Sequence, residues 1–422
     1  MKILVIPIGS WGDVHPLLGI ALQLRSRGHD VVFVTNGYFE PIARKAGLEF
    51  EALGTADVYR QALNDPDLWH PTRGTKKVLE WSMIELLRPT YQIIEKYHRP
   101  GETLVVSAAI GLGARLAYEK LKIPFVTTQL QPMAIYSNER PPRFPAIPEW
   151  APPWLSRFLI RLGDVVVVNP IILPPLNAFR RELGLPPVKG KIFSEFINSP
   201  QLVLGLFPEW FAEPPSDWPP QLRLTGFPLY DEKGMTPVDP ELKEFLDLGT
   251  PPVAFTPGSA MLQGLPFFTA AAEACRLLDR RGLLLTRFKE NIPAQLPPGV
   301  RHFSFAPFSE VLPRCAALVH HGGIGTMAQA LAAGIPQLVM PMAHDQPDNA
   351  ARLRRLGVGV SIARKHFTAE RVAAKLRQLL EDPLVLERAR QLAKKFEGVR
   401  AIESACDHIE ALGKSTAQPL AV

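Results

Sequence analysis

The stretch KILVIPIGSWGDVHPLLGIALQLRSRGHDVVFVT, residues 2–35, contains two short apolar runs separated by a glycine-bearing loop and a longer apolar-rich segment. The runs Lys2–Ile6 and Asp30–Thr35 are typical of buried strands, and Leu17–Arg27 is typical of a helix. The loop is expected to span Gly9–Pro16, with Pro16 in the first helical turn, where its missing N–H costs no hydrogen bond. The stretch therefore predicts one βαβ unit.

The same alternation of short apolar runs and helical patterns continues along the chain. The expected strands are Leu104–Val106, Pro124–Thr128, Gln201–Gly205, Leu222–Thr225, Val253–Thr256, Leu283–Thr286, His302–Phe305, Ala317–His320 and Gln337–Met340. The run Gly226–Pro240 is rich in proline and glycine and lacks an apolar period, so it is the best linker candidate.

These patterns predict an α/β protein with two Rossmann-like domains, residues 1–230 and 231–398. A helix over residues 399–412 is expected to return to the first domain, and residues 413–422 are expected to form a disordered tail. Open parallel sheets bind ligands beyond the carboxyl ends of their strands, so we expect the site in a cleft between the two domains.

Composition excludes several classes of protein. At 422 residues the chain fits two domains of ~100 to 200 residues each. Its 46% hydrophobic and 21% charged residues are unlike those of a disordered chain. The 43 prolines have no collagen-like period and indicate long ordered loops. Three cysteines without a C-x-x-C pair support neither a disulfide framework nor a thiolate zinc site, and they fit a reducing compartment.

No targeting or membrane-spanning segment is expected. The apolar run at the N terminus is too short for a signal-peptide core. The most apolar internal run, Val165–Leu176, is interrupted by prolines and is expected not to span a bilayer. The net charge of +6 is compatible with phosphates or an anionic membrane surface, but a slight excess of solvated lysine and arginine is the simpler explanation. No nucleic-acid partner is expected.

Asp13 and His15 follow the first strand, so we expect both near the carboxyl edge of the first sheet. Either residue could simply cap the next helix. A carboxylate there can also take a proton from an incoming hydroxyl, although its ordinary pKa of ~3.9 makes it a weak base unless it is desolvated. His15, with an ordinary pKa of ~6.5, is chemically the better base but lies further into the helix start.

A second turn, H-H-G-G-I-G-T from His320 to Thr326, follows an expected strand and opens a helix running to Ala333. Glycines allow close backbone approach, and a helix N-terminus carries a charge of about +0.5. With donors from His321 and Thr326, this turn suits a diphosphate. Adjacent histidines are more often structural than metal ligands, and no partner has zinc spacing, so no metal is expected.

A third cluster, M-A-H-D-Q-P-D-N from Met342 to Asn349, also follows an expected strand. A turn and a helix cap would explain Asp345 or Asn349 alone. A carboxylate beside a carboxamide also forms directional hydrogen bonds with sugar hydroxyls. The loop Thr256–Ser259, in the same half, offers backbone N–H groups to the phosphates.

In that order, G-D-V-x-P, H-x-G-x-x-T and D-Q resemble the motifs of inverting glycosyltransferases of the GT-B fold that use nucleotide sugars. The resemblance covers about residues 1–412. It implies that Asp13 is the base that deprotonates the acceptor. It also implies a donor site in which the turn after Ala317–His320 holds the diphosphate and the D-Q pair holds the sugar. The candidate residues of this donor site are Ser259, His321, Gly323, Gly325, Thr326, Asp345 and Gln346.

The stretch Phe305–Phe308 is similar to the W-A-P-Q that opens the donor motif of plant members, which implies that Phe305 stacks on the nucleotide base. Phe308 stands where plants have glutamine, and Gln329 stands where they have the glutamate that holds the ribose. No aspartate follows Leu104–Val106 to orient a catalytic histidine, as in plant enzymes, which favours Asp13 over a histidine dyad.

Within this family, the chain most resembles the bacterial rhamnosyltransferases that make mono-rhamnolipid. Shared stretches include Asp65–Trp69, Ser199–Gln201 with Leu206–Ala212, and Asp217–Pro219 with Thr225–Leu229. This likeness implies a dTDP-rhamnose donor and a lipid-like hydroxyl acceptor. Related bacterial enzymes use UDP-glucose and small phenolic acceptors, so the sequence leaves donor and acceptor open.

Aromatic residues gather among the prolines of residues 64–81 and 132–158. Most should form local cores under long loops. The others are candidates for an apolar acceptor pocket, because ligand sites are mainly hydrophobic with a few polar groups. The acceptor-binding candidates are Trp69, Trp81 and Tyr136.

We therefore expect a hexosyltransferase that moves rhamnose or glucose from a nucleoside diphosphate sugar to a hydroxyl of a hydroxy-fatty acid or an aromatic natural product. It would need no cofactor beyond the nucleotide sugar and no obligatory metal, and it would be cytoplasmic, with peripheral contact at the inner face of the membrane left open. The alternatives are a sugar-nucleotide epimerase and a non-catalytic binding protein of the same fold. Asp13 and the aromatic loops argue against both.

Overall fold

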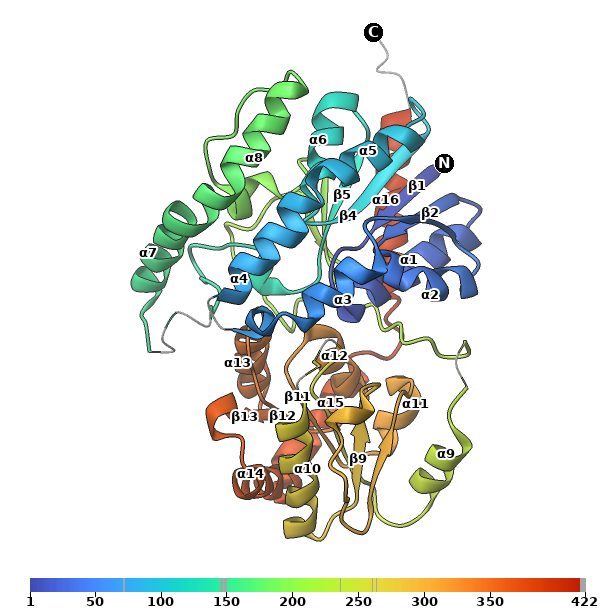
Figure 1. The fold of residues 1–422 in the computed structure, drawn as a ribbon, viewed down its shortest axis with the longest axis vertical. Helices are drawn as coiled ribbons and strands as arrows, with labels where there is room; N and C mark the ends of the chain where they lie inside the picture. The colour runs from blue at the N-terminus through green and yellow to red at the C-terminus, as the bar shows by residue number, and fades with distance from the viewer. Residues whose placement is uncertain are drawn as a thin grey trace. The chain divides into compact units, whose positions relative to one another are not determined.

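The computed structural model describes residues 1–70, 73–144, 147, 150–235, 237–259, 261–262 and 264–417. The chain divides into two compact units, each built on its own sheet (Figure 1). The N-terminal unit comprises Met1–Gly9, Asp13–Pro228 and the chain from Arg400 onward. The C-terminal unit comprises Leu229–Val399 together with Ser10–Gly12.

The N-terminal unit contains a seven-stranded sheet in the order β3-β2-β1-β4-β5-β6-β7, and all its pairs are parallel. The strands are β1 (Lys2–Ile6), β2 (Asp30–Thr35), β3 (Glu49–Ala52), β4 (Thr103–Ala108), β5 (Phe125–Gln129), β6 (Leu202–Gly205) and β7 (Leu222–Leu224). The helices are α1 (Trp11–Ser26), α2 (Glu40–Lys45), α3 (Ala56–Asn64), α4 (Arg73–Val78), α5 (Leu87–Tyr97), α6 (Leu112–Leu121), α7 (Pro153–Gly163), α8 (Asn169–Glu182) and α16 (Ala401–Ala417).

The C-terminal unit contains a six-stranded parallel sheet in the order β10-β9-β8-β11-β12-β13. The strands are β8 (Val253–Thr256), β9 (Gly282–Leu285), β10 (Val300–Phe303), β11 (Ala317–His320), β12 (Gln337–Val339) and β13 (Gly359–Ser361). The helices are α9 (Pro240–Asp247), α10 (Leu265–Leu278), α11 (Phe308–Val311), α12 (Ile324–Ala332), α13 (Gln346–Leu356), α14 (Ala369–Glu381) and α15 (Pro383–Lys394).

Both sheets reverse their strand order at one point, between β1 and β4 in the first and between β8 and β11 in the second. Loops that leave neighbouring strands at such a point run to opposite faces of the sheet and leave a crevice at the carboxyl ends. Buried aliphatic and aromatic side chains cover the sheets, and strands β1, β8 and β11 are buried along their whole length. The predicted pair of Rossmann-like folds is confirmed.

The start of the chain differs from the expectation in one respect. Helix α1 begins at Trp11, so Asp13 and His15 lie in its first turns and not in a loop. Pro16 lies inside the helix. The expectation of Pro16 in the first turn is wrong, because the helix already begins at Trp11, ahead of Asp13.

Prolines were expected to interrupt the apolar segment around Val165–Leu176, but the helix continues through them. Helix α7 continues through a π turn, Asp164–Val168, into α8. Because Pro170 follows this turn in the first turn of α8, the wider π winding accommodates its missing N–H. By length and composition alone, Pro153–Glu182 is one helix able to cross a bilayer, and 17% of its most apolar window is buried.

The C-terminal helix α16 belongs to the N-terminal unit, where Arg27 forms ion pairs with Asp407 and Glu410. It extends past residue 413, where a disordered tail was expected. The hydroxyls of Ser415 and Thr416 donate to the carbonyl of Leu412, which satisfies an acceptor at the helix end. The rest of the expected tail, residues 418–422, lies outside the described residues.

Candidate active site

The turn after β11 is organised by a buried histidine. His320 is fully buried, its Nδ1 accepts a hydrogen bond from the Gly322 N–H (3.1 Å), and its Nε2 donates to Oε1 of Gln337 (2.9 Å). This pairing requires the neutral tautomer protonated at Nε2. Burial lowers the pKa of His320 to about 3, so the ring stays neutral at physiological pH. His320 therefore shapes the turn and has no free nitrogen for a ligand.

His321 lies where the loops after β8 and β11 meet. A Cβ atom at Gly258 would lie 2.7 Å from Cε1 of His321, and one at Gly323 would lie 2.5 Å from its Nε2. Both positions therefore need glycine. Nδ1 of His321 is buried without a hydrogen-bond partner among the described residues, and burial lowers the pKa of the ring to about 4. The ring can therefore bind a ligand as a neutral hydrogen-bonding group.

The N-terminus of α12 is open to a ligand. Gly323 occupies the cap position, and no side chain caps the helix. A Cβ atom at Gly325 would have no neighbouring atom within 4 Å, and Thr326 is half-buried. The first N–H groups of a helix lack partners within the helix and attract anions. The turn thus offers backbone donors beside His321, as the predicted diphosphate site requires.

The Asp345–Gln346 pair opens α13, and Asn349 connects it to the turn after β11. Nδ2 of Asn349 donates to the carbonyl oxygen of Gly322 (2.9 Å) and to Oδ2 of Asp345 (2.6 Å). Oε1 of Gln346 accepts from the N–H groups of Met342 (2.7 Å) and Ala343 (3.2 Å). The oxygen of Gln346 therefore holds the loop after β12.

The candidate base-binding residues Phe305 and Phe308 follow β10 in the chain. Phe305 follows that strand and is half-buried, and the guanidinium of Arg287 lies 5.0 Å from the centre of its ring. Phe308 begins α11 and packs partly against the core of the unit, while Gln329 is buried on α12. Ser259, in the loop after β8, is exposed.

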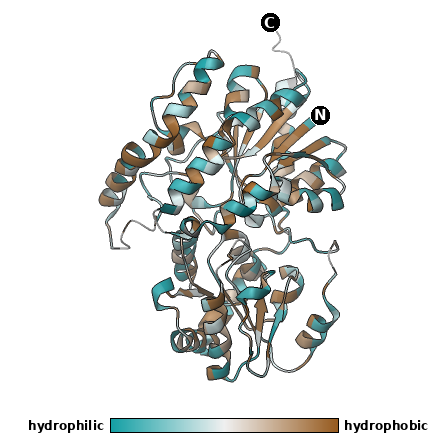
Figure 2. Ribbon diagram, in the orientation of Figure 1, coloured by the Kyte–Doolittle hydropathy of each residue, from teal (hydrophilic) through white to brown (hydrophobic). Residues whose placement is uncertain are grey.

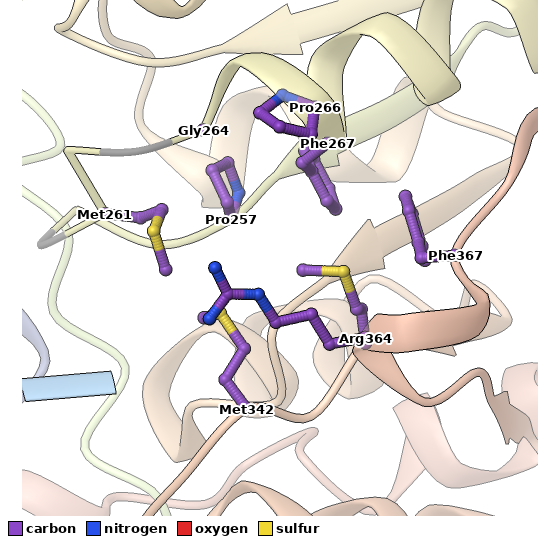
Figure 3. Close-up of a pocket in the computed structure, with 9 residues that line it drawn as sticks. Pro257, Met261, Gly264, Pro266, Phe267, Met342, Arg364 and Phe367 are labelled. Carbon is purple, nitrogen blue, oxygen red and sulfur yellow. The ribbon is translucent and has the colours of Figure 1, made fainter. Parts of the chain in front are cut away.

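A pocket of about 140 Å³ lies beside these loops (Figure 3). Pro257 and Met261 come from the loop after β8, Met342 comes from the loop after β12, and Phe267 comes from α10. Its lining is apolar except for Arg364, an exposed residue with no described hydrogen bond or ion pair. Two of the loops that line the pocket, those after β8 and β12, also carry the candidate donor residues Ser259, Asp345 and Gln346.

In the N-terminal unit, the side chain of Asp13 packs against Gly9 in the preceding turn. Gly9 has φ +136°, and a Cβ atom there would lie 2.2 Å from Oδ2 of Asp13, so only glycine fits. Asp13 and His15 are both half-buried. Burial raises the pKa of Tyr59, and the negative charge of Asp13 raises it further, which places this phenol near the carboxylate.

Tyr59 connects Asp13 to an aromatic cluster. Its ring lies 4.9 Å from that of Tyr38, 5.2 Å from that of Phe39 and 6.0 Å from that of Trp81. Nε1 of Trp81 is buried without a hydrogen-bond partner among the described residues. A largely buried aromatic cluster with one unused donor, close to a carboxylate, is a candidate wall for an apolar acceptor site.

The described contacts of Tyr136 are with a second group of aromatic residues. Tyr136 stacks on Phe193, with ring centres 5.9 Å apart, and contacts Phe144 edge to face. Trp69 ends a short helical turn, Pro66–Trp69, and is half-buried. The structure thus brings Trp81 near Asp13 and places Tyr136 in a second aromatic group.

Sequence analysis missed the bridging role of Asn349 and the positions of Arg287 and Arg364. Asn349 lies one helical turn after Asp345, and this i, i+4 spacing was the available signal. The two arginines come from loops after β9 and β13, which carry no glycine-rich or D-Q signal. Among the described residues, no group of three or more His, Cys, Asp or Glu side chains is placed to hold a metal.

Two doubly wound parallel units with polar turns at their switch points define the GT-B glycosyltransferase fold. The glycosyltransferase of kitacinnamycin has this fold, with a TM-score of 0.75, 22% identity and coverage of 97% of this chain and 98% of that chain. The spinosyn rhamnosyltransferase SpnG, solved with thymidine diphosphate, gives a TM-score of 0.68 at 19% identity, covering 99% and 100%.

Sequence comparison identifies the family. Residues 3–136 match the glycosyltransferase family 28 N-terminal domain, and residues 284–399 match the C-terminal domain of proteins like erythromycin biosynthesis protein CIII. The chain is 30% identical to O-mycaminosyltylonolide 6-deoxyallosyltransferase of Streptomyces fradiae over 97% of each protein. It therefore belongs to the family 28 and EryCIII-like glycosyltransferases of the GT-B fold.

Proposed function

We propose that this glycosyltransferase moves a hexosyl group, with inversion, from a nucleoside diphosphate sugar to a hydroxyl of a small lipophilic acceptor. The observation that carries the proposal is the Asn349 bridge between Gly322 and Asp345. It joins a turn suited to a diphosphate and a carboxylate suited to sugar hydroxyls in one rigid arrangement. A nucleotide sugar carries these two groups next to each other.

In the proposed reaction, Asp13 accepts the proton of the acceptor hydroxyl as its oxygen bonds to the anomeric carbon. The bond from that carbon to the diphosphate oxygen breaks at the same time, which inverts the configuration. Negative charge then grows on the departing diphosphate. The open N–H groups of α12 and the neutral ring of His321 stabilise it by hydrogen bonds.

For the donor, we favour a dTDP-deoxyhexose, with dTDP-rhamnose ahead of UDP-glucose. The apolar pocket beside the Asp345 loop supports this choice, because it suits the methyl group of a 6-deoxy sugar better than a hydroxymethyl group that would need hydrogen bonds. The names of two similar proteins are consistent with a dTDP-deoxyhexose donor. One is a 6-deoxyallosyltransferase, and the other is a rhamnosyltransferase solved with thymidine diphosphate.

For the acceptor, we propose a small lipophilic molecule with a free hydroxyl, either a hydroxy-fatty acid or an aromatic natural product. The cluster of Tyr38, Tyr59 and Trp81 supports an apolar acceptor. Its position near Asp13 also argues against an epimerase or a non-catalytic binding protein, since neither needs an acceptor surface. We propose that the enzyme needs no obligatory metal, that it works in the cytoplasm, and that it touches the membrane only peripherally.

Calorimetry with dTDP and UDP, followed by turnover assays in the presence of EDTA, tests this proposal. The assays pair dTDP-rhamnose and UDP-glucose with a hydroxy-fatty acid and with a flavonoid, and they measure both nucleotide release and product mass. We expect dTDP to bind at least as tightly as UDP and rhamnose to be transferred. Nucleotide binding with no sugar transfer to any hydroxyl would refute the transferase. Glucose transfer alone would refute the deoxyhexose donor.

A further inference from the structure

The exposed apolar face of α7 and the following π turn has no role in the candidate site. Trp150, Trp154, Phe158 and Leu162 are 76%, 63%, 58% and 45% exposed, and Val165 and Val166 are 64% and 61% exposed. We call these six residues the α7 face. In Figure 2, α7 is coloured mostly brown, for hydrophobic residues. Soluble monomers rarely expose large continuous apolar patches, and those they expose are often interaction sites.

The α7 face forms a continuous stripe. Trp154, Phe158 and Leu162 are spaced four residues apart on α7, so they lie on one side of the helix. Val166, in the π turn, continues the same spacing. Trp150, which is 76% exposed, lies just before the helix. Tryptophan prefers the interface between lipid and water, where its ring is buried and its N–H remains solvated.

This helix cannot cross a bilayer while the unit stays folded. Val168, Ile172, Leu176 and Phe179 on its second half are at most 8% exposed and belong to the core that also contains Tyr91. Insertion of the whole helix would remove these side chains from the core. Only the first half, α7 and the π turn, is free to contact lipid.

Positive charge flanks the α7 face. The guanidinium of Arg157 donates to the carbonyl oxygen of Asn138 (2.9 Å), and that of Arg161 donates to Oδ1 of Asn138 (3.2 Å). In the described part of the chain, neither arginine forms an ion pair with a carboxylate. Asp164 is the one acidic residue between 153 and 168, and burial raises its pKa to about 6. Two positive charges beside the stripe are therefore left for an external anion.

We propose that the α7 face docks on an anionic lipid bilayer, with the helix lying in the headgroup layer and its aromatic side chains inserted between lipids. An amphipathic helix with aromatic and basic residues binds in this way, through buried apolar area and attraction to anionic lipids. A second copy of the chain is a poorer occupant, because two copies packed face to face would bring their arginines together without acidic partners. The docking does not depend on which sugar or acceptor the enzyme uses.

Co-sedimentation of the full-length protein with vesicles tests the proposal. One set of vesicles contains phosphatidylcholine alone, and the other contains phosphatidylcholine with phosphatidylglycerol. We expect the protein to bind the anionic vesicles preferentially and to be released by salt. The triple variant Trp154→Ser, Phe158→Ser, Val166→Ser should bind at least ~10-fold more weakly. The matched control is Leu384→Ser, which removes a leucine that is 63% exposed on α15 and should leave binding unchanged.

The double variant Arg157→Gln, Arg161→Gln keeps the apolar stripe and should abolish the preference for anionic vesicles. It also tests the proposal if the triple variant fails to fold. Equal vesicle binding by the wild type and both variants would overturn the proposal. Light scattering that shows a dimer lost only in the triple variant would overturn it in favour of an interface between copies. Turnover on a water-soluble acceptor should be unchanged in both variants, so loss of that turnover would instead place the face at the acceptor site.

Discussion

The side-chain nitrogen of Asn349 lies 2.9 Å from the carbonyl oxygen of Gly322 and donates a hydrogen bond to it. Gly322 has φ +101°, a conformation that favours glycine, and a Cβ atom there would lie 2.8 Å from Val339. The turn after β11 is therefore held from both sides, by His320 at the N–H of Gly322 and by the Asn349 amide of α13 at its carbonyl oxygen. The same amide also donates a hydrogen bond to Asp345, the candidate sugar-binding carboxylate. The turn after β11 and this carboxylate are therefore fixed relative to each other.

Replacement of this amide by Asn349→Ala should lower kcat/KM for the donor by ~10- to 100-fold, because it leaves the buried carbonyl of Gly322 unpaired and frees Asp345. Steady-state kinetics at varied donor concentration measures this. The control Asn177→Ala also removes a bridging amide, one that pairs with both backbone groups of Val188 in the other unit. Equal losses in both variants would mean that Asn349 contributes only stability.

Asp13→Asn should lower turnover by at least ~100-fold and leave nucleotide affinity nearly unchanged, because an amide cannot accept the proton of the acceptor. His15→Ala should have a smaller effect. Turnover assays and calorimetry on both variants measure these effects. If the ranking is reversed, the base is His15, and near-normal turnover of Asp13→Asn would exclude Asp13.

His321→Ala should weaken binding of nucleoside diphosphate by roughly 1.5 to 3 kcal/mol, the value of a hydrogen bond to a charged group. Calorimetry with free dTDP and UDP measures this change. His98→Ala, in the N-terminal unit, is the matched control and should bind both nucleotides like the wild type. Unchanged affinity in the His321 variant would place the phosphates elsewhere.

Acid should destabilise the folded protein through His320. The ordinary pKa of 6.5 applies in the unfolded chain, whereas burial lowers the folded value to about 3. Between these values the unfolded chain binds more protons, so the free energy of unfolding falls as the pH decreases from 6.5 towards 3. His321, with its pKa lowered to about 4, acts in the same direction.

Urea unfolding at several pH values between neutral and about pH 5 checks this linkage. The variant His320→Gln should be less stable at neutral pH, because it loses the hydrogen bonds of the ring. Its free energy of unfolding should nevertheless depend less steeply on pH over this range. An unchanged slope would show that His320 does not titrate as its burial requires.

The sequence by itself determined the class of the fold and most of its strands. The strands β1, β2, β8 and β11 have the predicted bounds, because each is an apolar run bounded by turn residues. The edge strands β3 and β13 were missed, since they are short and partly exposed and their apolar signal is weak. The polar turns that follow the strands also indicated the candidate site residues, because the local sequence pattern predicts where a strand ends.

Only the tertiary structure decided how these residues are used. Gly258 and His321 are far apart in the sequence, but β8 and β11 are neighbours in the sheet, so their loops meet and the ring lies against the glycine. The sequence indicated Gln346 as a candidate sugar-binding residue, but only the structure shows that its side-chain oxygen accepts hydrogen bonds from the backbone N–H groups of Met342 and Ala343. The sequence pattern around a residue predicts whether its side chain is buried. Which residue that side chain contacts depends on the order of the strands and on the path of the loops. Contacts between strand ends are therefore not determined until the sheet has formed.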